Sequence, residues 1–134
     1  MLEIRFEQPF DFRMEVVETD DHVPSMRVDT KIVIPQFQHA LSYQGTFWLE
    51  CSTWTSFLDA LSGDLSNQPA VLQDSNAYFM LKIWVDKRVR TLLWEFKKAD
   101  VGGGRSVIAT FSAAIDDSVL ARIMTEFAEF PAWW

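Results

Sequence analysis

The sequence predicts one α+β domain, in which an antiparallel sheet is covered by two helices in the order strands, helix, strands, helix. Hydrophobic residues make up 49% and charged residues 23% of the 134 residues, as in globular domains. Runs that alternate between apolar and polar residues lie on both sides of a stretch with helical spacing. Short connections between these runs favour antiparallel neighbours. Because no repeat or linker divides the chain, we expect a single domain over residues 1–134.

The first hairpin is predicted from two alternating runs that flank an acidic turn. The first run starts at Phe12, the second starts at Met26, and the turn spans residues 20–24. The residues expected on the buried faces are Phe12, Met14, Val16, Met26, Val28, Thr30, Ile32 and Ile34. One wet face and one apolar face are typical of a sheet that is covered on one side.

A further strand is expected over residues 39–50, after an interruption at Pro35. Leu41, Tyr43 and Phe47 would face inward on this strand. Gln44 and Gly45 lie at its centre, where a glycine favours a bulge or a turn.

The first helix is expected over residues 52–62. Ser52 or Thr53 would cap its start, and Gly63 would follow its end. The apolar positions at spacings of three, four and seven residues are Trp54, Phe57, Leu58 and Leu61. They form one helical face, which we expect to be buried.

Three strands and a second helix complete the predicted domain. The strands are expected over residues 77–85, 89–96 and 106–115. The helix is expected over residues 117–129, with Asp116 or Asp117 as its cap. Its buried face would hold Leu120, Ile123 and Phe127.

The net charge of −7 is unevenly distributed. Residues 82–105 hold seven basic and three acidic residues, a net charge of +4, which leaves −11 on the rest of the chain. Five acidic residues gather in or beside the predicted hairpin turn: Glu15, Glu18, Asp20, Asp21 and Asp29. Since such a field attracts basic partners, we predict that these residues bind a protein partner.

No pattern in the chain predicts catalytic, cofactor-binding or metal-ligating residues. The run Gly102-Gly103-Gly104-Arg105-Ser106 lacks the Lys-Ser/Thr ending of a phosphate loop and leads into a strand, which favours a hairpin loop. His22 and His39 lack the spacing of metal ligands. Cys51 has no histidine beside it in sequence and is expected to be a small buried residue.

Three other interpretations were weighed against partner binding. Residues of one strand parity, Arg88, Arg90, Trp94, Phe96 and Lys98, resemble a platform for single-stranded nucleic acid, but the negative net charge opposes it. A pocket between sheet and helices, lined by Trp54 and Trp84, would instead serve an enzyme or a small-ligand-binding protein. A third interpretation, a self-associating structural protein, follows from Trp133 and Trp134, which would pack on the protein's own sheet, in a homodimer interface or on a partner.

The location of the protein is predicted from what the chain lacks. No uncharged run reaches the length of a membrane helix, and charges at Glu3, Arg5 and Glu7 disrupt a signal-peptide pattern. A single cysteine fits a reducing compartment. We therefore expect a cytoplasmic protein that binds neither membranes nor nucleic acid.

Four segments after residue 46 carry a resemblance to a known family. They are Phe47-Trp48-Leu49-Glu50, Phe57-Leu58-Asp59-Ala60-Leu61, Asp74-Ser75-Asn76-Ala77-Tyr78-Phe79 and the stretch from Phe127 to Trp134. Over this part the chain resembles the WapI-like immunity proteins of bacterial contact-dependent and polymorphic toxin systems. Family members commonly have Glu-Pro-Asn where this chain has Asp74-Ser75-Asn76.

The resemblance implies a function without naming a binding site. It implies a non-enzymatic cytoplasmic antitoxin that binds and neutralises a cognate toxin domain, which would be a nuclease in many such systems. Nuclease surfaces are positive because they hold phosphates, so an acidic protein can compete for them.

Overall fold

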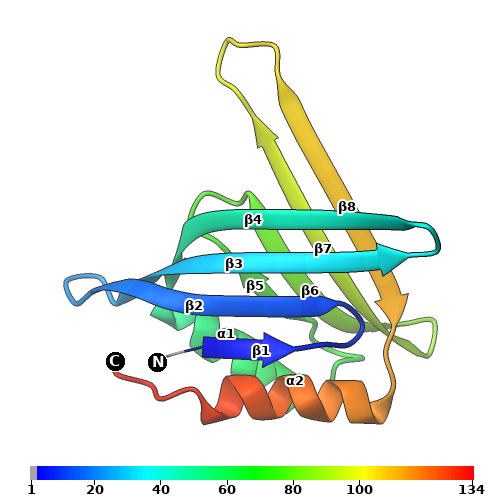
Figure 1. Cartoon of the computed structure of the whole chain (residues 1–134). Coiled ribbons are helices and arrows are strands. Elements are labelled where there is room, and N and C mark those ends of the chain that lie inside the picture. The colour runs from blue at the N-terminus through cyan, green and yellow to red at the C-terminus, as the bar shows by residue number, and fades with distance from the viewer. Residues whose placement is uncertain (1–2) are drawn as a thin grey trace.

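The computed structural model describes residues 3–134 and places them in two four-stranded antiparallel sheets and two helices (Figure 1). The first sheet contains β1 (Glu3–Phe6), β2 (Asp11–Asp20), β3 (Ser25–Gln36) and β4 (His39–Glu50). The second contains β5 (Ala70–Gln73), β6 (Phe79–Asp86), β7 (Val89–Ala99) and β8 (Ser106–Ala114). Helix α1 (Cys51–Leu61) joins the sheets, and α2 (Asp117–Glu129) follows β8. The predicted α+β class is confirmed, and the strands divide between two sheets.

The core lies between the two sheets. Rings from the first sheet meet rings from the second, as in the stacked pair Phe47 and Phe79, whose centroids are 4.5 Å apart. Phe10, in the loop between β1 and β2, makes a further contact with Phe111 of β8 at 5.4 Å. The alternating positions predicted to be buried on β2 and β3 are confirmed at Phe12, Met14, Met26, Val28, Thr30, Ile32 and Ile34. Their pairing in register explains why these buried residues share one face of the sheet, where Thr30 is the polar member.

The helices lie together along one side of this sandwich (Figure 1). Helix α1 contacts β5, α2 contacts β1, and the helices contact each other. The Phe127 ring of α2 lies 4.9 Å from that of Trp54 and 5.0 Å from that of Phe57 on α1. Of the predicted helix core, Leu61 and Ile123 are also buried, whereas Leu58 and Leu120 are half-buried at its rim. Strand β4 is the edge of the first sheet away from α2, whereas β8, the edge of the second sheet, leads directly into α2 (Figure 1).

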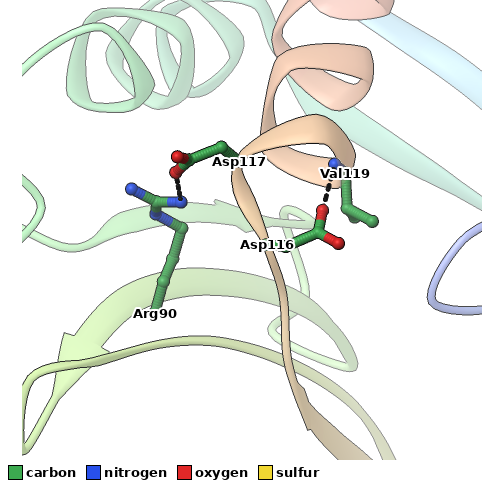
Figure 2. A network of polar contacts seen from close by, with 4 residues as sticks. All are labelled: Arg90, Asp116, Asp117 and Val119. Atoms are coloured by element: carbon green, nitrogen blue, oxygen red, sulfur yellow. Dashed lines mark hydrogen bonds and ion pairs between the residues drawn. The ribbon is translucent and has the colours of Figure 1, made fainter.

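The two helices begin in different ways. Asp116 caps α2, since its carboxylate accepts a hydrogen bond from the Val119 N–H at 2.9 Å, and Asp117 forms an ion pair with Arg90 (Figure 2). The Asp116 cap was predicted and is confirmed. The predicted cap of α1 by Ser52 or Thr53 is wrong, because Glu50 occupies the cap position and makes no side-chain hydrogen bond there.

The strands differ from the predictions at three places. β3 continues through Pro35, which pairs with Ala40 near the end of the ladder. β4 has no bulge at its centre, since Gln44 and Gly45 stay in register with β3. The irregularity lies instead in β2, between Val16 and Glu18.

The β7–β8 hairpin extends beyond the sandwich (Figure 1). Its turn is closed by a hydrogen bond from the Asp100 N–H to the Arg105 carbonyl at 2.8 Å and by an ion pair between their side chains at 3.2 Å. Gly102 and Gly104 have positive φ angles of 72° and 69°, which glycine adopts without strain. The glycine run is therefore a hairpin turn, as predicted.

The two C-terminal tryptophans lie against their own chain. Trp133 is half-buried and packs on the hydrophobic core. The indole N–H of Trp134 donates a hydrogen bond to the Thr55 hydroxyl of α1 at 3.1 Å. The two rings meet edge to face, with centroids 5.8 Å apart.

Candidate functional site

The five carboxylates predicted to bind a partner all lie on the β2–β3 hairpin, but in two separate places. Glu15 and Asp29 are directly opposite each other in the middle of the first sheet. Both point to its outer face, because their neighbours Met14 and Thr30 point into the core. Glu18, Asp20 and Asp21 lie at or near the turn. The hairpin thus gathers the five residues on one element without forming one continuous patch.

The middle of the outer face carries balanced charge. Strand register aligns Glu3, Glu15 and Asp29 in a row across three strands. The next row holds Arg5, Arg13 and Lys31. An ion pair of 2.6 Å between Arg13 and Glu3 connects the two rows. Glu15 and Asp29 therefore have cations beside them, which weakens their field at a distance.

The turn end of the hairpin has the more exposed negative charge. Glu18 is paired with Arg27 across the strands at 2.9 Å. Asp20 accepts a hydrogen bond from the His22 N–H at 2.9 Å, and Asp21 is exposed. Neither Asp20 nor Asp21 forms an ion pair with any residue in the range 3–134. We define these two residues together with Glu18 as the acidic turn.

A second candidate site is a cleft between the two sheets, next to β4. Its cavity of about 240 Å³ is lined by β4, by the segment before β6 and by β7. Half of the lining residues are aromatic, namely Tyr43, Phe47, Tyr78, Phe79 and Phe96, and the lining includes Asp74 and Lys98. We call this the aromatic cleft.

Asp74 is the buried charged residue of the aromatic cleft, with only 5% of its surface exposed. One carboxylate oxygen accepts hydrogen bonds from the N–H groups of Tyr78, at 2.7 Å, and Phe79, at 2.8 Å. The other oxygen is buried and has no hydrogen-bond partner among the residues described. In the sequence, Asp74 stands out only as part of a segment that carries the family resemblance. The turn-forming run Asp74-Ser75-Asn76 before a strand was the available signal.

Tyr43 lies on the opposite wall of the cleft. Burial raises the pKa of its phenol to about 12, and the nearby charge of Asp74 adds to this shift. Its ring centroid is 5.0 Å from that of Phe96 and 5.2 Å from that of Trp94. Gly45 leaves room for the phenol, since a Cβ atom at that position would collide with the Tyr43 hydroxyl.

The alternative of a pocket lined by Trp54 and Trp84 is not supported, because Trp54 lies in the core and Trp84 lies on an outer face. Trp54 is 2% exposed and packs against Phe127 and Phe130 in the core. Trp84 lies on the outer face of the second sheet, where the ammonium of Lys82 is 4.5 Å from its ring. Alternation along β6 explains the difference, since Ile83 beside Trp84 points inward.

The nucleic-acid platform considered for the basic strand is also not assembled. Trp94 is fully buried, so its ring cannot stack on a base. Phe96 is half-buried between the sheets, and Arg90 is engaged with Asp117. The positive residues of this segment remain on the surface without the aromatic partners that the interpretation required.

The other candidates for chemistry are isolated in the fold. Cys51 is buried, as predicted, and burial raises the pKa of its thiol. Within residues 3–134, no three side chains of histidine, cysteine, aspartate or glutamate are grouped so that they could hold a metal ion. In the same range no helix is long and apolar enough to cross a membrane.

The fold and its two candidate sites define a two-sheet α+β domain that presents an acidic turn and an aromatic cleft. Comparison of the chain with models of protein families, with curated proteins and with solved structures finds no match.

Proposed function

We propose that this protein is a bacterial immunity protein, a cytoplasmic antitoxin that binds a cognate toxin domain and blocks its activity without being an enzyme. The proposal rests on the family resemblance and on the exposed charge of the acidic turn. Many toxins of such systems act on nucleic acids, and a nuclease would present the basic surface that an acidic partner recognises.

The observation that carries the proposal is the unpaired charge at the acidic turn. Asp20 and Asp21 project from the end of a long hairpin, away from the balanced charges of the mid-sheet. Carboxylates in this position act over about 10 Å at moderate salt and can guide a basic surface into contact. Strands β2 and β3 hold the turn on a rigid support, because their inner faces belong to the core.

The residues that carry the resemblance support the fold that the proposal assumes. Phe47, Leu49, Phe57, Phe79 and Phe127 are all buried. A shared set of core residues favours a shared fold, while the partner-binding surface of each family member would differ with its toxin.

A second candidate function is favoured by the aromatic cleft. A cavity of about 240 Å³ with a buried carboxylate has room for a single side chain or for a ligand of a few heavy atoms. The alternative function of binding a small ligand is therefore placed at the aromatic cleft around Asp74, and not at Trp54 and Trp84.

The proposal is tested with the protein encoded immediately upstream, because an immunity gene is expected to follow the gene of its toxin. The C-terminal domain of that upstream protein is expressed alone and together with this chain. We expect growth arrest only when it is expressed alone, and a complex of the two proteins that elutes as one species. Growth arrest in both cultures, without a complex, would contradict the immunity function.

A further inference from the structure

We propose that the aromatic cleft binds a primary alkylammonium group, with Asp74 as its counter-ion and the rings of Tyr43, Tyr78 and Phe96 as its walls. The ammonium would belong either to a lysine side chain of a partner or to a free small amine. The inference does not rest on the immunity function, because a small amine alone can test it.

The free oxygen of Asp74 is the first reason. Asp74 is 95% buried, and the turn before β6 uses only the Oδ1 atom of its carboxylate, through two backbone N–H groups. Its Oδ2 atom has no donor within the described chain. A buried acceptor without a donor is unfavourable, and a buried charge without a counter-charge is more so. A bound cation that carries N–H groups supplies both the hydrogen-bond donor and the positive counter-charge.

The aromatic walls are the second reason. Faces of aromatic rings attract cations, and several aromatic residues line this cleft. One of them already receives an ammonium from within the protein, since the Lys98 Nζ atom lies 5.5 Å from the centre of the Tyr78 ring. Lys98 forms no ion pair with Asp74 or any other carboxylate in the range 3–134. It therefore marks the entrance of the cleft as a place that accepts an ammonium.

The volume of the cavity and its single carboxylate favour an ammonium over other ligands. The cavity of about 240 Å³ holds one short chain, given that a water molecule takes up ~30 Å³ of the liquid. Ca²⁺ or Mg²⁺ requires several oxygen ligands, whereas Asp74 is the one carboxylate in the lining. A guanidinium binds best to both oxygens of a carboxylate, but Oδ1 of Asp74 is already occupied. A compact ammonium needs only one acceptor and a wall of rings.

The test is a titration of the full chain with n-butylamine, which is protonated at neutral pH, followed by NMR of the backbone amides. We expect the Tyr78 and Phe79 amides, which donate to Asp74, to shift in a saturable way. Neutral n-butanol has the same length without the charge and is expected to leave them unchanged. Equal shifts with n-butanol would overturn the proposal.

Asp74→Asn is the informative variant. Its amide oxygen can still accept from the two backbone N–H groups, while the charge is lost and an NH₂ group replaces the free oxygen. We expect at least a tenfold loss of affinity for butylamine. Asp86→Asn makes the same charge change at the exposed β6–β7 turn and should alter the affinity by less than twofold. Undiminished binding by Asp74→Asn would overturn the proposal.

Two further variants keep the proposal testable if Asp74→Asn does not fold. Tyr78→Leu removes a wall ring that is 39% exposed, and it should weaken butylamine binding severalfold. Lys98→Met removes the ammonium that competes for the entrance, and it should tighten binding. Unchanged affinity in both variants would contradict the assigned site.

The source of the ammonium is assigned by comparing butylamine with a lysine blocked at its amino and carboxyl groups. If the blocked lysine binds at least as tightly, the cleft receives a lysine side chain of a partner. If only the free amine binds, the cleft is a site for small amines. Failure of both to bind the wild-type chain would refute the site, whatever the result for the immunity function.

Discussion

Two neighbouring aspartates at the start of α2 have different energetic roles. Asp116 satisfies the Val119 N–H, one of the helix-end donors that otherwise lacks a partner, whereas the Asp117 side chain is 95% exposed in its ion pair with Arg90. Asp116→Ala is expected to lower the free energy of unfolding by about 1 kcal/mol. Asp117→Ala is expected to leave it nearly unchanged, as measured by denaturant unfolding. An equal loss in both variants would contradict this assignment.

Tyr43 gives the protein a specific sensitivity to alkaline pH. Burial raises the pKa of its phenol from 10.0 to about 12, with a further contribution from Asp74. Between these pH values the folded state keeps a proton that the unfolded state releases, so the stability from this group is full below pH 10 and is lost as the pH rises toward 12.

Tyr43→Phe should therefore flatten the loss of stability over that alkaline interval. Denaturant unfolding at a series of pH values measures the slope. Asp74→Asn should reduce the slope without abolishing it, because burial of the phenol remains. An unchanged slope in Tyr43→Phe would show that other groups determine the alkaline behaviour.

The role of a single residue could be predicted from the sequence where it depends only on neighbouring residues in the chain. Asp116 could be predicted because a helix cap needs only an acceptor at the right position before an apolar stripe. The role of Asp74 could not be predicted, since its burial depends on how β4 packs over the segment before β6. The α1 cap was predicted wrongly because the chain enters this helix directly from β4, where the Cys51 N–H already donates to the Pro24 carbonyl at 2.8 Å.

The two helices are held by apolar side chains that pack against each other and against the sheets. Ile123 is fully buried on α2, whereas Leu120, one turn earlier, is half-buried. Ile123→Ala is expected to cost about 2 to 5 kcal/mol of unfolding free energy, from lost burial and the cavity that remains. Leu120→Ala should cost clearly less in the same denaturant experiment. A larger cost at Leu120 would mean that the packing of α2 is misassigned.

The C-terminal tryptophans are expected to stabilise the fold from outside the sheets. Trp133 covers part of the core, and Trp134 is fixed to Thr55. Removal of both residues should lower the melting temperature by several degrees, as a loss of about 1 to 2 kcal/mol would in a domain of this size. Thr55→Val, which removes only the hydrogen bond to Trp134, should lower it less.

The same truncation tests the alternatives for these two residues. If the truncated protein melts unchanged but its mass by light scattering falls from dimer to monomer, the tryptophans belong to a homodimer interface. If it melts unchanged and no longer binds the toxin domain, they are partner anchors.

Length decided which elements the sequence could predict. The long strands and both helices show their periodicity over eight or more residues, and α2 has the predicted bounds. β1 and β5, with four residues each, were not predicted. Each strand has only two buried positions, Ile4 and Phe6 in β1 and Ala70 and Leu72 in β5. An alternating pattern this short does not distinguish a strand from a loop. They are edge strands, so their existence depends on the neighbours β2 and β6.

The division of the strands into two sheets is a property of the whole molecule. Helix α1 separates β4 from β5, and the sheets then pack face to face with both helices along the side of β1 and β5. Alternation of apolar and polar residues along a strand indicates that one face is buried, but it does not indicate which element covers that face. The sequence therefore predicted the class, while the second sheet as the covering layer became apparent only from the packing.

The charge of the molecule is also distributed by this arrangement. The acidic turn lies at one end of the first sheet, whereas the β7–β8 hairpin, which carries Lys97, Lys98 and Arg105, belongs to the second sheet and extends beyond the sandwich (Figure 1). A partner with a basic surface should therefore approach from the end of the acidic turn. A matched control for this end is available at the other end of β2, in Glu7 and Asp11, and at the β6–β7 turn, in Asp86.

The most direct test of partner binding through the acidic turn is the association rate with the toxin domain, measured at two salt concentrations. Glu18, Asp20 and Asp21 are together changed to lysine, and the control changes Glu7, Asp11 and Asp86 in the same way. We expect the acidic-turn variant to associate roughly tenfold more slowly at low salt, with a flattened salt dependence, because exposed charges act mainly by steering. The control should keep most of the wild-type rate. Equal rates for the acidic-turn variant and the wild type at both salt concentrations would contradict the assignment of this surface.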